Sequence, residues 1–287
     1  MKTYLECLPC FVSQTVRAAQ ILFDNENDRK EVISETLRIL AGMDYNQPPP
    51  LMKHKIDRVF CDKIGNYDPY FEDKIRFNNI ALELYPELKR RIEVSLDPWE
   101  TGVRLSAAGN TIDLGVYGIV EKAAIDQAID FALTQPIPLH AVDKLRRKAE
   151  EAESILFIGD NAGEIVFDRL LIEMLPKNKV TFAVRGKPTI NDALMKDAVD
   201  TGIADLVKVI DSGIDIPGTI PELSSPEMNA ELQKADLIIA KGQGNFETLS
   251  DYSSDICFLF KVKCEIIARD SGIEKGKIAV MWGENSN

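Results

Sequence analysis

The sequence predicts an α/β fold, in which a mostly helical N-terminal region precedes a three-layer, doubly wound and mostly parallel sheet. Over residues 1–150, apolar side chains recur at intervals of three and four, and long β-branched runs are missing. From residue 154 onward, short apolar runs bounded by Gly, Asp or Asn alternate with amphipathic stretches of about a dozen residues. Because this alternation is typical of βαβ units, we expect residues 151–287 to form a Rossmann-like α/β domain.

The N-terminal region contains three apolar stripes at helical spacing. Proline and glycine segments, NQPPPL (46–51) and GNYDPY (65–70), separate the expected helices. We expect this region to pack on the sheet or to cap its functional edge. The stripes are Val12, Val16, Ala19 and Phe23; then Val32, Thr36, Ile39 and Leu40, ending at Gly42; and the segment 119–133.

Six apolar runs in the C-terminal half are expected to be strands. Most of them are almost continuously apolar, as parallel strands covered on both faces are. Ligands of such sheets bind beyond the carboxyl ends of the strands, so the residues that follow each run are the candidates for a site. The runs cover residues 154–158, 180–184, 206–210, 237–240, 256–260 and 277–281.

Composition excludes several classes of function. The net charge of −12 and the pI near 4.8 oppose binding to nucleic acid or to anionic membranes. No basic segment leads into a long apolar run, so neither a signal peptide nor a membrane span is expected, and the protein is predicted to be cytoplasmic. Five cysteines at irregular spacing suggest reduced thiols. With only two histidines in the chain, a metal ion is expected to have oxygen ligands.

Two of the expected strand-end loops carry oxygen donors. The loop GDNAGE (159–164) presents Asp160 and Asn161 side by side, which suits a hard divalent cation. The loop after the second strand offers Arg185, whose planar fork can hold phosphate, and a second carboxylate, Asp192, at an expected helix start. Taken alone, Asp160, Asn161 and Asp192 are also explained as helix caps.

A third loop, KGQGNFE (241–247), resembles segments that cradle phosphate. Lys241 supplies a cation, while Gly242 and Gly244 expose backbone N–H groups before an expected helix. Its ordinary explanation is a glycine-rich turn between a strand and a helix. Because three polar loops follow three strands at the same edge of the sheet, together they predict a cation that faces a phosphate.

Common nucleotide and hydrolase motifs are not satisfied. The loop 159–164 lacks the length and the lysine of a Walker A motif. Glu247 stands where a dinucleotide fingerprint needs a small residue, and Ala162 stands where a haloacid-dehalogenase nucleophile needs a second aspartate. Neither His54 nor His140 lies in an expected strand-end loop, which argues against Ser-His-Asp catalysis.

The loops GDNAGE, RGKPTIND (185–192) and KGQGNFE, together with AAGNTID (107–113), resemble the damage-control phosphatase family. The resemblance covers nearly the whole chain and includes Cys7-Leu8-Pro9-Cys10, typical of the compact archaeal and bacterial branch. It implies a phosphatase that depends on a divalent metal, Mn²⁺, Ni²⁺, Co²⁺ or Mg²⁺. Its partner would be a phosphorylated small molecule, such as a sugar phosphate or a damaged nucleotide.

The resemblance also implies roles for individual residues. Asp160, Asn161 and Asp192 would bind the metal ion, and Lys241 would bind the phosphoryl group. Asn110 and Asp113 match a segment near the family's active site. Glu164 and Arg185 are expected to orient other site residues or to pair with each other. These residues and the expected phosphate loop, which contributes Gly242, Gly244 and Asn245, complete the predicted site.

Several alternatives stay open on the sequence alone. Attack by metal-activated water and attack by the Asp160 carboxylate are both compatible with the site. An S-adenosylmethionine-dependent carboxyl methyltransferase and a non-catalytic sensor of sugar phosphates or nucleotides are the competing functions. Cys7 and Cys10, with Cys61, either form a metal or redox site or pack in an opening helical turn.

Overall fold

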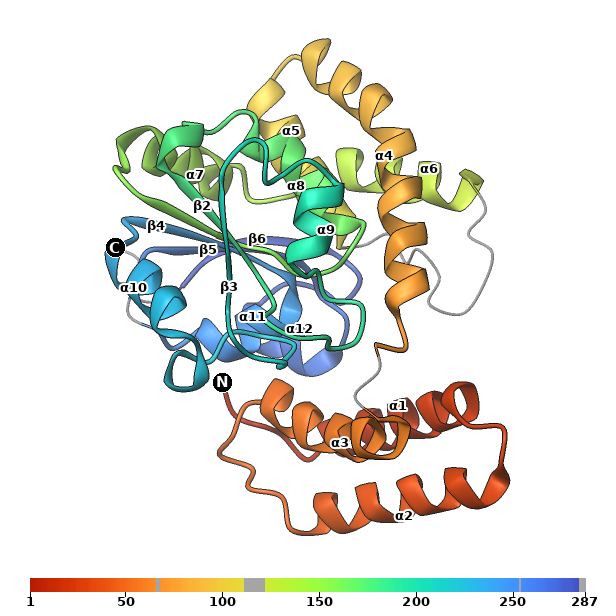
Figure 1. Ribbon diagram of the computed structural model, residues 1–287. Helices are drawn as coiled ribbons and strands as arrows, with labels where there is room; N and C mark the ends of the chain where they lie inside the picture. Colours follow the sequence, from red (N-terminus) through yellow and green to blue (C-terminus); the bar gives the residue numbers. More distant parts are fainter. Residues whose placement is uncertain (66–67, 111–121, 253, 284–287) are drawn as a thin grey trace.

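A computed structural model of the chain describes residues 1–65, 68–110, 122–252 and 254–283. Its first three helices, α1 (Cys7–Leu22), α2 (Glu26–Ala41) and α3 (Pro49–Ile64), form a bundle below the sheet in Figure 1. The bundle has its own core, to which Val32, Met52 and Ile56 contribute. Pro49 and Pro50 occupy the first turn of α3, so the proline segment opens a helix as well as separating two.

The buried face of α1 differs by one residue from the expected stripe. Phe11, Thr15 and Ala19 are buried, whereas Val12 and Val16 are half-buried. The two stripes are adjacent on a helix, and the position of α2 and α3 decides which of them is covered. The stripe of α2 is buried at Val32, Thr36 and Leu40, as expected.

The C-terminal half contains a six-stranded sheet in the order β3-β2-β1-β4-β5-β6. All pairs are parallel except β5 with β6, which confirms the predicted mostly parallel sheet. Because β1 pairs with both β2 and β4, the order reverses there, and the carboxyl ends of these strands border the usual ligand crevice. The strands are β1 (Ile155–Ile158), β2 (Val180–Val184), β3 (Lys208–Asp211), β4 (Leu237–Lys241), β5 (Ile256–Lys261) and β6 (Ile278–Trp282).

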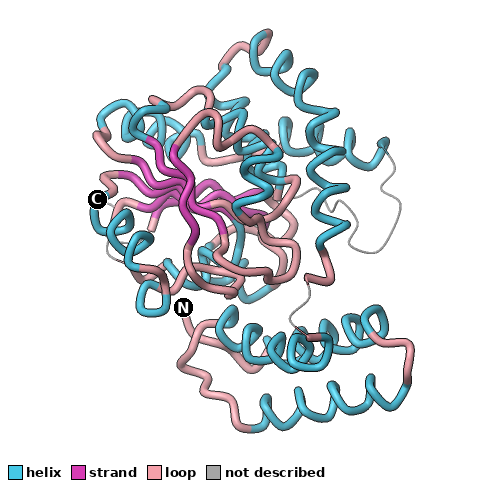
Figure 2. Tube along the Cα trace, viewed as in Figure 1, coloured by secondary structure: helices cyan, strands magenta, loops and turns pink. Residues whose placement is uncertain are grey.

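Helices cover both faces of the sheet, which makes three layers (Figures 1 and 2). The other helices are α4 (Phe71–Glu93), α5 (Pro98–Gly109), α6 (Lys122–Thr134), α7 (Leu139–Glu151), α8 (Glu164–Ile172), α9 (Met195–Asp200), α10 (Pro226–Lys234), α11 (Gly242–Leu249) and α12 (Glu265–Ser271). Two short 3-10 helices, Lys177–Lys179 and Pro221–Leu223, complete the elements of the described residues.

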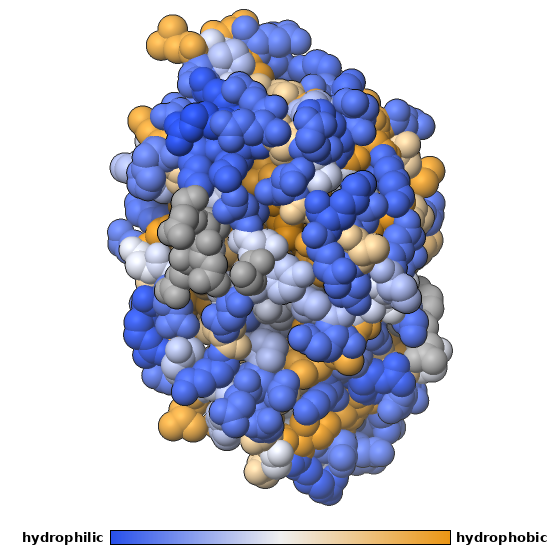
Figure 3. Space-filling view, turned by 90° about the vertical axis from the view of Figure 1, so that its left-hand side faces the viewer, coloured by the Kyte–Doolittle hydropathy of each residue, from blue (hydrophilic) through white to orange (hydrophobic). Residues whose placement is uncertain are grey.

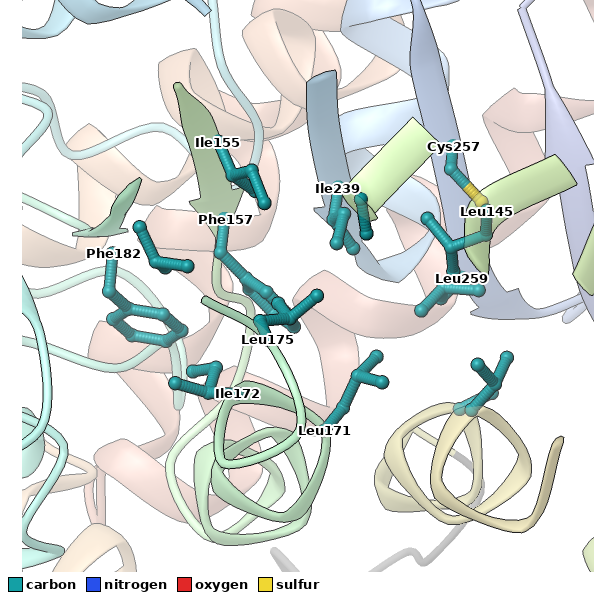
Figure 4. Packing of buried hydrophobic residues seen from close by; sticks show 14 of the residues in the cluster. Leu145, Ile155, Phe157, Leu171, Ile172, Leu175, Phe182, Ile239, Cys257 and Leu259 are labelled. Carbon is teal, nitrogen blue, oxygen red and sulfur yellow. The ribbon is translucent and has the colours of Figure 1, made fainter. Parts of the chain in front are cut away.

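Alternate residues of each strand enter two separate cores. Ile155 and Phe157 of β1 face the helices α5, α7 and α8, and Figure 4 shows Phe157 beside Leu175, on the side of the sheet where Leu171 and Ile172 of α8 lie. The intervening Leu156 belongs to the core under α10, α11 and α12. Burial on both faces explains the continuous apolar runs of β1, β2, β4 and β5, whereas in the edge strand β3 only Ile210 is buried.

The surface in Figure 3 is mostly hydrophilic, with apolar residues in scattered groups. Within the part of the chain that the structure describes, no helix combines the length and apolarity needed to cross a bilayer.

Candidate active site

The loops after β1 and β2 are joined by their backbones at the carboxyl edge of the sheet. Asn161 and Asp192 form an antiparallel bridge, and the N–H of Ala193 donates to the carbonyl oxygen of Asp160 at 2.8 Å. Asp192 therefore does not begin a helix, contrary to the sequence-based expectation, because α9 starts only at Met195. The cap of α8 is Gly163, without a side-chain hydrogen bond, so Asp160 and Asn161 are not explained as helix caps.

The segment after β4 is packed directly against Asp160. Gly242 has a φ of +80°, and a Cβ atom on it would lie 2.0 Å from Oδ2 of Asp160. Only glycine fits this close approach. The segment expected to be a glycine-rich loop is in fact the first turn of α11, which starts at Gly242. A Cβ on Gly244 would lie 2.0 Å from the carbonyl oxygen of Pro217, so this glycine serves packing.

Two carboxamides connect Asp160 with Glu164. Nδ2 of Asn110 donates to Oδ2 of Asp160 at 3.0 Å and to Oε2 of Glu164 at 2.9 Å. Nδ2 of Asn161 donates to the same two oxygens, at 2.7 and 2.9 Å. The structure thus brings Asn110, at the end of α5, into the site, while Asp113 lies outside the described residues.

Lys241 is completely buried at the end of β4. Its Nζ donates to Oε1 of Glu164 at 2.7 Å, to Oδ1 of Asp168 at 2.5 Å and to the carbonyl oxygen of Ser106 at 2.8 Å. Because an ammonium group has three donors, all of them are engaged. The phosphoryl-binding role of Lys241 stays a prediction, and it requires that one of these contacts be exchanged for substrate.

Arg185 binds Asp192, the second of the two carboxylates expected to bind the metal ion. Its Nε donates to Oδ2 of Asp192 at 2.7 Å, and a terminal nitrogen lies 3.8 Å from Oδ1 of Asp160. The same guanidinium reaches Oδ1 of Asn245 at 3.4 Å. Arg185 and Glu164 therefore have different partners instead of pairing with each other. Asn245 is fully buried and donates to the carbonyl oxygen of Lys241 at 2.7 Å, so it connects the second and third loops.

The buried carboxyl groups have perturbed pKa values. Burial, and the neighbouring charges of Asp192 and Glu164, raise the pKa of Asp160 to about 8. Burial raises the pKa of Asp192, although the adjacent Arg185 opposes the shift. Burial would also raise the pKa of Glu164, but the charge of Lys241 and three hydrogen bonds outweigh it and hold that pKa below its usual range.

The charge balance of the cluster suits a divalent cation. Four buried carboxyl groups, Asp160, Glu164, Asp168 and Asp192, face two buried cations, Lys241 and Arg185, which leaves two negative charges when all are ionised. The buried Lys74 nearby is paired with Asp68 and does not change this balance. Buried charges without partners are costly, and a cation with oxygen ligands would remove this cost.

The ligand set would need a carboxamide as well as carboxylates. Within the described residues, no three His, Cys, Asp or Glu side chains are grouped so as to hold a metal ion. The predicted set of Asp160, Asn161 and Asp192 is compatible with this result, because one of its members, Asn161, is an amide. Nδ2 of Asn161 faces the carboxylates, and rotation about the last side-chain bond would present Oδ1 there instead. The residues present thus fit a hard divalent ion.

Four residues of the cluster were not found from the sequence. Asp168 follows Glu164 by four residues on α8, a spacing that places both on one helix face and could have revealed it. Ser106 donates from Oγ to Asp168 at 2.8 Å. Asn78 and Lys74 come from α4, and no sequence signal connects them with the loops.

The cysteines do not assemble a metal site within the described residues. All five are free thiols, with Cys10 exposed and Cys7 and Cys61 half-buried. Burial raises the pKa of Cys7 and that of Cys10, which keeps both thiols protonated near neutral pH. Cys7 packs against the core of the bundle, whereas Cys10 is exposed, so packing accounts for Cys7 only.

The fold and the site define a class: a doubly wound α/β protein with acidic loops at its topological switch point, suited to a metal ion and an anionic substrate. The damage-control phosphatase ARMT1-like domain family matches residues 3–279, and the chain belongs to this family. The family is one of metal-dependent phosphatases that act on phosphorylated small molecules.

Relatives agree over nearly the full length. A damage-control phosphatase of Archaeoglobus fulgidus is 36% identical, covering 96% of this chain and 97% of the relative. A damage-control phosphatase of Pyrococcus horikoshii is 33% identical, covering 98% of each chain. A crystal structure of a DUF89 family protein from Pyrococcus horikoshii superposes with a TM-score of 0.90 at 33% identity, covering 99% of this chain and all of that one. These similarities support phosphatase activity.

Proposed function

We propose that this chain hydrolyses phosphomonoesters of small metabolites, with a divalent metal ion held by Asp160, Asn161 and Asp192. The observation that carries the proposal is the excess of buried carboxyl groups over buried cations at the carboxyl edge, directly beside the N-terminus of α11. When bound there, a divalent ion supplies Lewis-acid polarisation of the phosphoryl group. Mn²⁺, Ni²⁺, Co²⁺ and Mg²⁺ are the candidate ions, since all accept oxygen ligands.

The protein's own residues hold the carboxylates and receive the phosphoryl group. Arg185 keeps Asp192 in place through its 2.7 Å hydrogen bond, and Asn110 spans Asp160 and Glu164. The first amide groups of α11 have no carbonyl partner within the helix, so they are available to phosphoryl oxygens. Lys241 lies at the cap of this helix and adds positive charge near the same point.

Two routes of attack fit the cluster. In one, water attacks the phosphorus in line, the P–O bond to the alcohol breaks, and the alcohol leaves with a proton. In the other, the carboxylate of Asp160 displaces the alcohol and forms an acyl phosphate, which water then hydrolyses to phosphate and the free carboxylate. Rapid acid quenching during turnover, followed by mass analysis of the peptide that contains Asp160, distinguishes them. A peptide that carries one phosphoryl group supports attack by Asp160, and an unmodified peptide supports attack by water.

The test of the function is a substrate screen with the purified chain and each of the four ions. We expect metal-stimulated phosphate release from p-nitrophenyl phosphate and from members of a panel of sugar phosphates and damaged nucleotides. Asp160→Asn should remove more than about 99% of the activity, the scale of losing a metal or nucleophile contact, while Asp130→Asn, at an exposed ion pair, should not.

No hydrolysis of any phosphate ester with any ion would refute the proposal. Tight binding of a phosphate ester without turnover would instead indicate a sensor. Binding of S-adenosylmethionine would indicate the methyltransferase, for which we expect no affinity at millimolar ligand.

A further inference from the structure

A groove lies between the helical bundle and the C-terminal end of α11. Residues of the segment 47–51, where α3 begins, form one side of it. The other side is formed by the 3-10 helix Pro221–Leu223, the end of α11 and the residues 251–252. The groove offers about 530 Å³ of space accessible to water, which is in the range of small-molecule sites. None of the predicted metal ligands lines it, so the groove is separate from the candidate active site.

The walls of the groove combine apolar side chains with carboxyl groups. None of the described lining residues is Lys, Arg or His, so no basic side chain offsets the acidic ones. A ligand of this groove would therefore have to be positively charged and partly apolar. The apolar residues include Pro48, Leu51, Ile220 and Leu223, and the acidic residues are Glu222, Glu247 and Asp251.

The groove already holds one ammonium group, that of Met1, which lies between the bundle and the α/β domain (Figure 1). Its nitrogen donates to the carbonyl oxygen of Glu247 at 2.9 Å and to Oγ of Ser250 at 3.3 Å, and it lies 3.1 Å from Oδ2 of Asp251. The carbonyl groups at the C-terminus of a helix carry partial negative charge, which favours a cation at this end of α11. Met1 pairs with Asp251 and thereby shows which chemical group this wall binds.

Two carboxyl groups of the groove are left without a cation. Glu222 is exposed, Glu247 is only 9% exposed, and neither forms an ion pair within the part of the chain that the structure describes. The carboxyl group of Glu247 accepts a hydrogen bond from Nε2 of Gln243 at 2.7 Å. Burial raises the pKa of Glu247 to about 7, although the charges of Lys263 and the N-terminus oppose the shift. Because a buried carboxylate without a cation is costly, a cation in the groove would stabilise the ionised form of Glu247.

We infer that this groove binds an aliphatic diamine. One ammonium group pairs with Glu247 and the other with Glu222, while the hydrocarbon chain between them covers the apolar wall that contains Leu223. The inference is independent of the proposed function, because no residue of the carboxylate cluster takes part in it.

The test compares three probes that share a six-carbon chain: 1,6-diaminohexane, hexylamine and 1,6-hexanediol. They carry two, one and no ammonium groups at pH 8.5, which is above the pKa of Glu247. Isothermal titration calorimetry of the full chain at physiological ionic strength measures their affinities. We expect the diamine to bind about tenfold more tightly than hexylamine, because it makes a second charged contact, and the diol not to bind at millimolar concentration.

Three variants locate the diamine in the groove. Glu247→Gln should weaken its binding about tenfold, as the loss of a charge at a buried hydrogen-bonding group does, and Glu222→Gln about threefold, as for an exposed ion pair. Leu223→Ser should weaken it about threefold by removing apolar contact. The matched control is Glu274→Gln, at an exposed carboxylate outside the groove, which should leave the affinity unchanged. Glu222 and Leu223 are exposed, so their variants keep the test decisive if Glu247→Gln does not fold.

Equal losses of affinity in Glu222→Gln and Glu274→Gln would overturn the inference, since they would indicate general attraction to the net charge of −12. No binding of the diamine at millimolar concentration, or equal affinities for the diamine and the diol, would overturn it as well. Asp160→Asn removes a charge from the carboxylate cluster and should leave diamine binding unchanged. A loss of binding in that variant would place the diamine at the cluster and refute a site in the groove.

Discussion

Oδ1 of Asn78 accepts a hydrogen bond of 2.7 Å from the backbone N–H of Gly163, the residue that ends the first loop. The other end of the same carboxamide donates to Oδ1 of Asp197 at 2.8 Å, and Asp197 in turn accepts from the N–H of Leu194. A single buried side chain of α4 thus links the loop that carries Asp160 with the segment that follows Asp192.

Replacing Asn78 should weaken the metal site without removing any predicted ligand. We expect Asn78→Ala to raise the Mn²⁺ concentration for half-maximal activity about tenfold, because outer contacts orient metal ligands. Titration of activity with Mn²⁺ measures the effect, and Asn229→Ala, which also removes a carboxamide bonded to backbone, is the control. A lower melting temperature with an unchanged Mn²⁺ requirement would show that Asn78 is only structural.

Gly242→Ala should abolish activity, since a methyl group there would lie 2.0 Å from the Asp160 carboxylate. The matched control is Gly276→Ala, because Gly276 also has a positive φ, +89°, but no atom lies within 4 Å of its Cβ position. Both variants should lose about 1 to 2 kcal/mol of stability from the left-handed backbone. Phosphate release measures the effect on activity, and chemical denaturation measures the effect on stability. An active Gly242→Ala protein would contradict the close packing of Gly242 against Asp160.

Lys241→Met should destabilise the protein by about 3 to 5 kcal/mol, because it leaves Glu164 and Asp168 buried without their cation. Adding Asp168→Asn should restore part of this loss, since it removes one of the two charges. Urea denaturation of the two single variants and the double variant measures the coupling. Additive effects would mean that Lys241 and Asp168 do not stabilise each other, and activity should be absent wherever Lys241 is replaced.

Glu247 predicts a dependence of stability on pH. Burial raises its pKa to about 7, from 4.5 in an unfolded chain, although Gln243 donates to it at 2.7 Å. Because the folded pKa is the higher one, its contribution is complete below pH 4.5 and is lost as the pH rises through 7. Glu247→Gln should therefore be more stable than wild type at pH 8.5, by up to about 3 kcal/mol, and similar to it at pH 4.5.

Urea denaturation at these two pH values checks the prediction, and the exposed Glu222→Gln is the control. The same stability difference at both values would show that Glu247 does not titrate with folding.

Local patterns were sufficient for the strands and for the first two loops. The six strands of the sheet lie within two residues of the expected runs. In β1, β2, β4 and β5, burial on both faces imposes a continuous apolar sequence. Asp160, Asn161 and Asp192 come together as expected, since parallel strands end at the same edge. The expected loop at 241–247 proved to be a helix, because glycine at its start permits both conformations.

The amino-acid order alone therefore determined the sheet, its carboxyl edge and the proximity of the three residues that we propose as metal ligands, because these follow from periodicity over a few positions. Only the tertiary structure decided that Lys241 is enclosed by Glu164 and Asp168, and that Asn78 joins two loops. Such contacts connect residues more than 70 positions apart in the chain. The packing of helices on the sheet brings these residues into contact, and no local sequence pattern predicts such contacts.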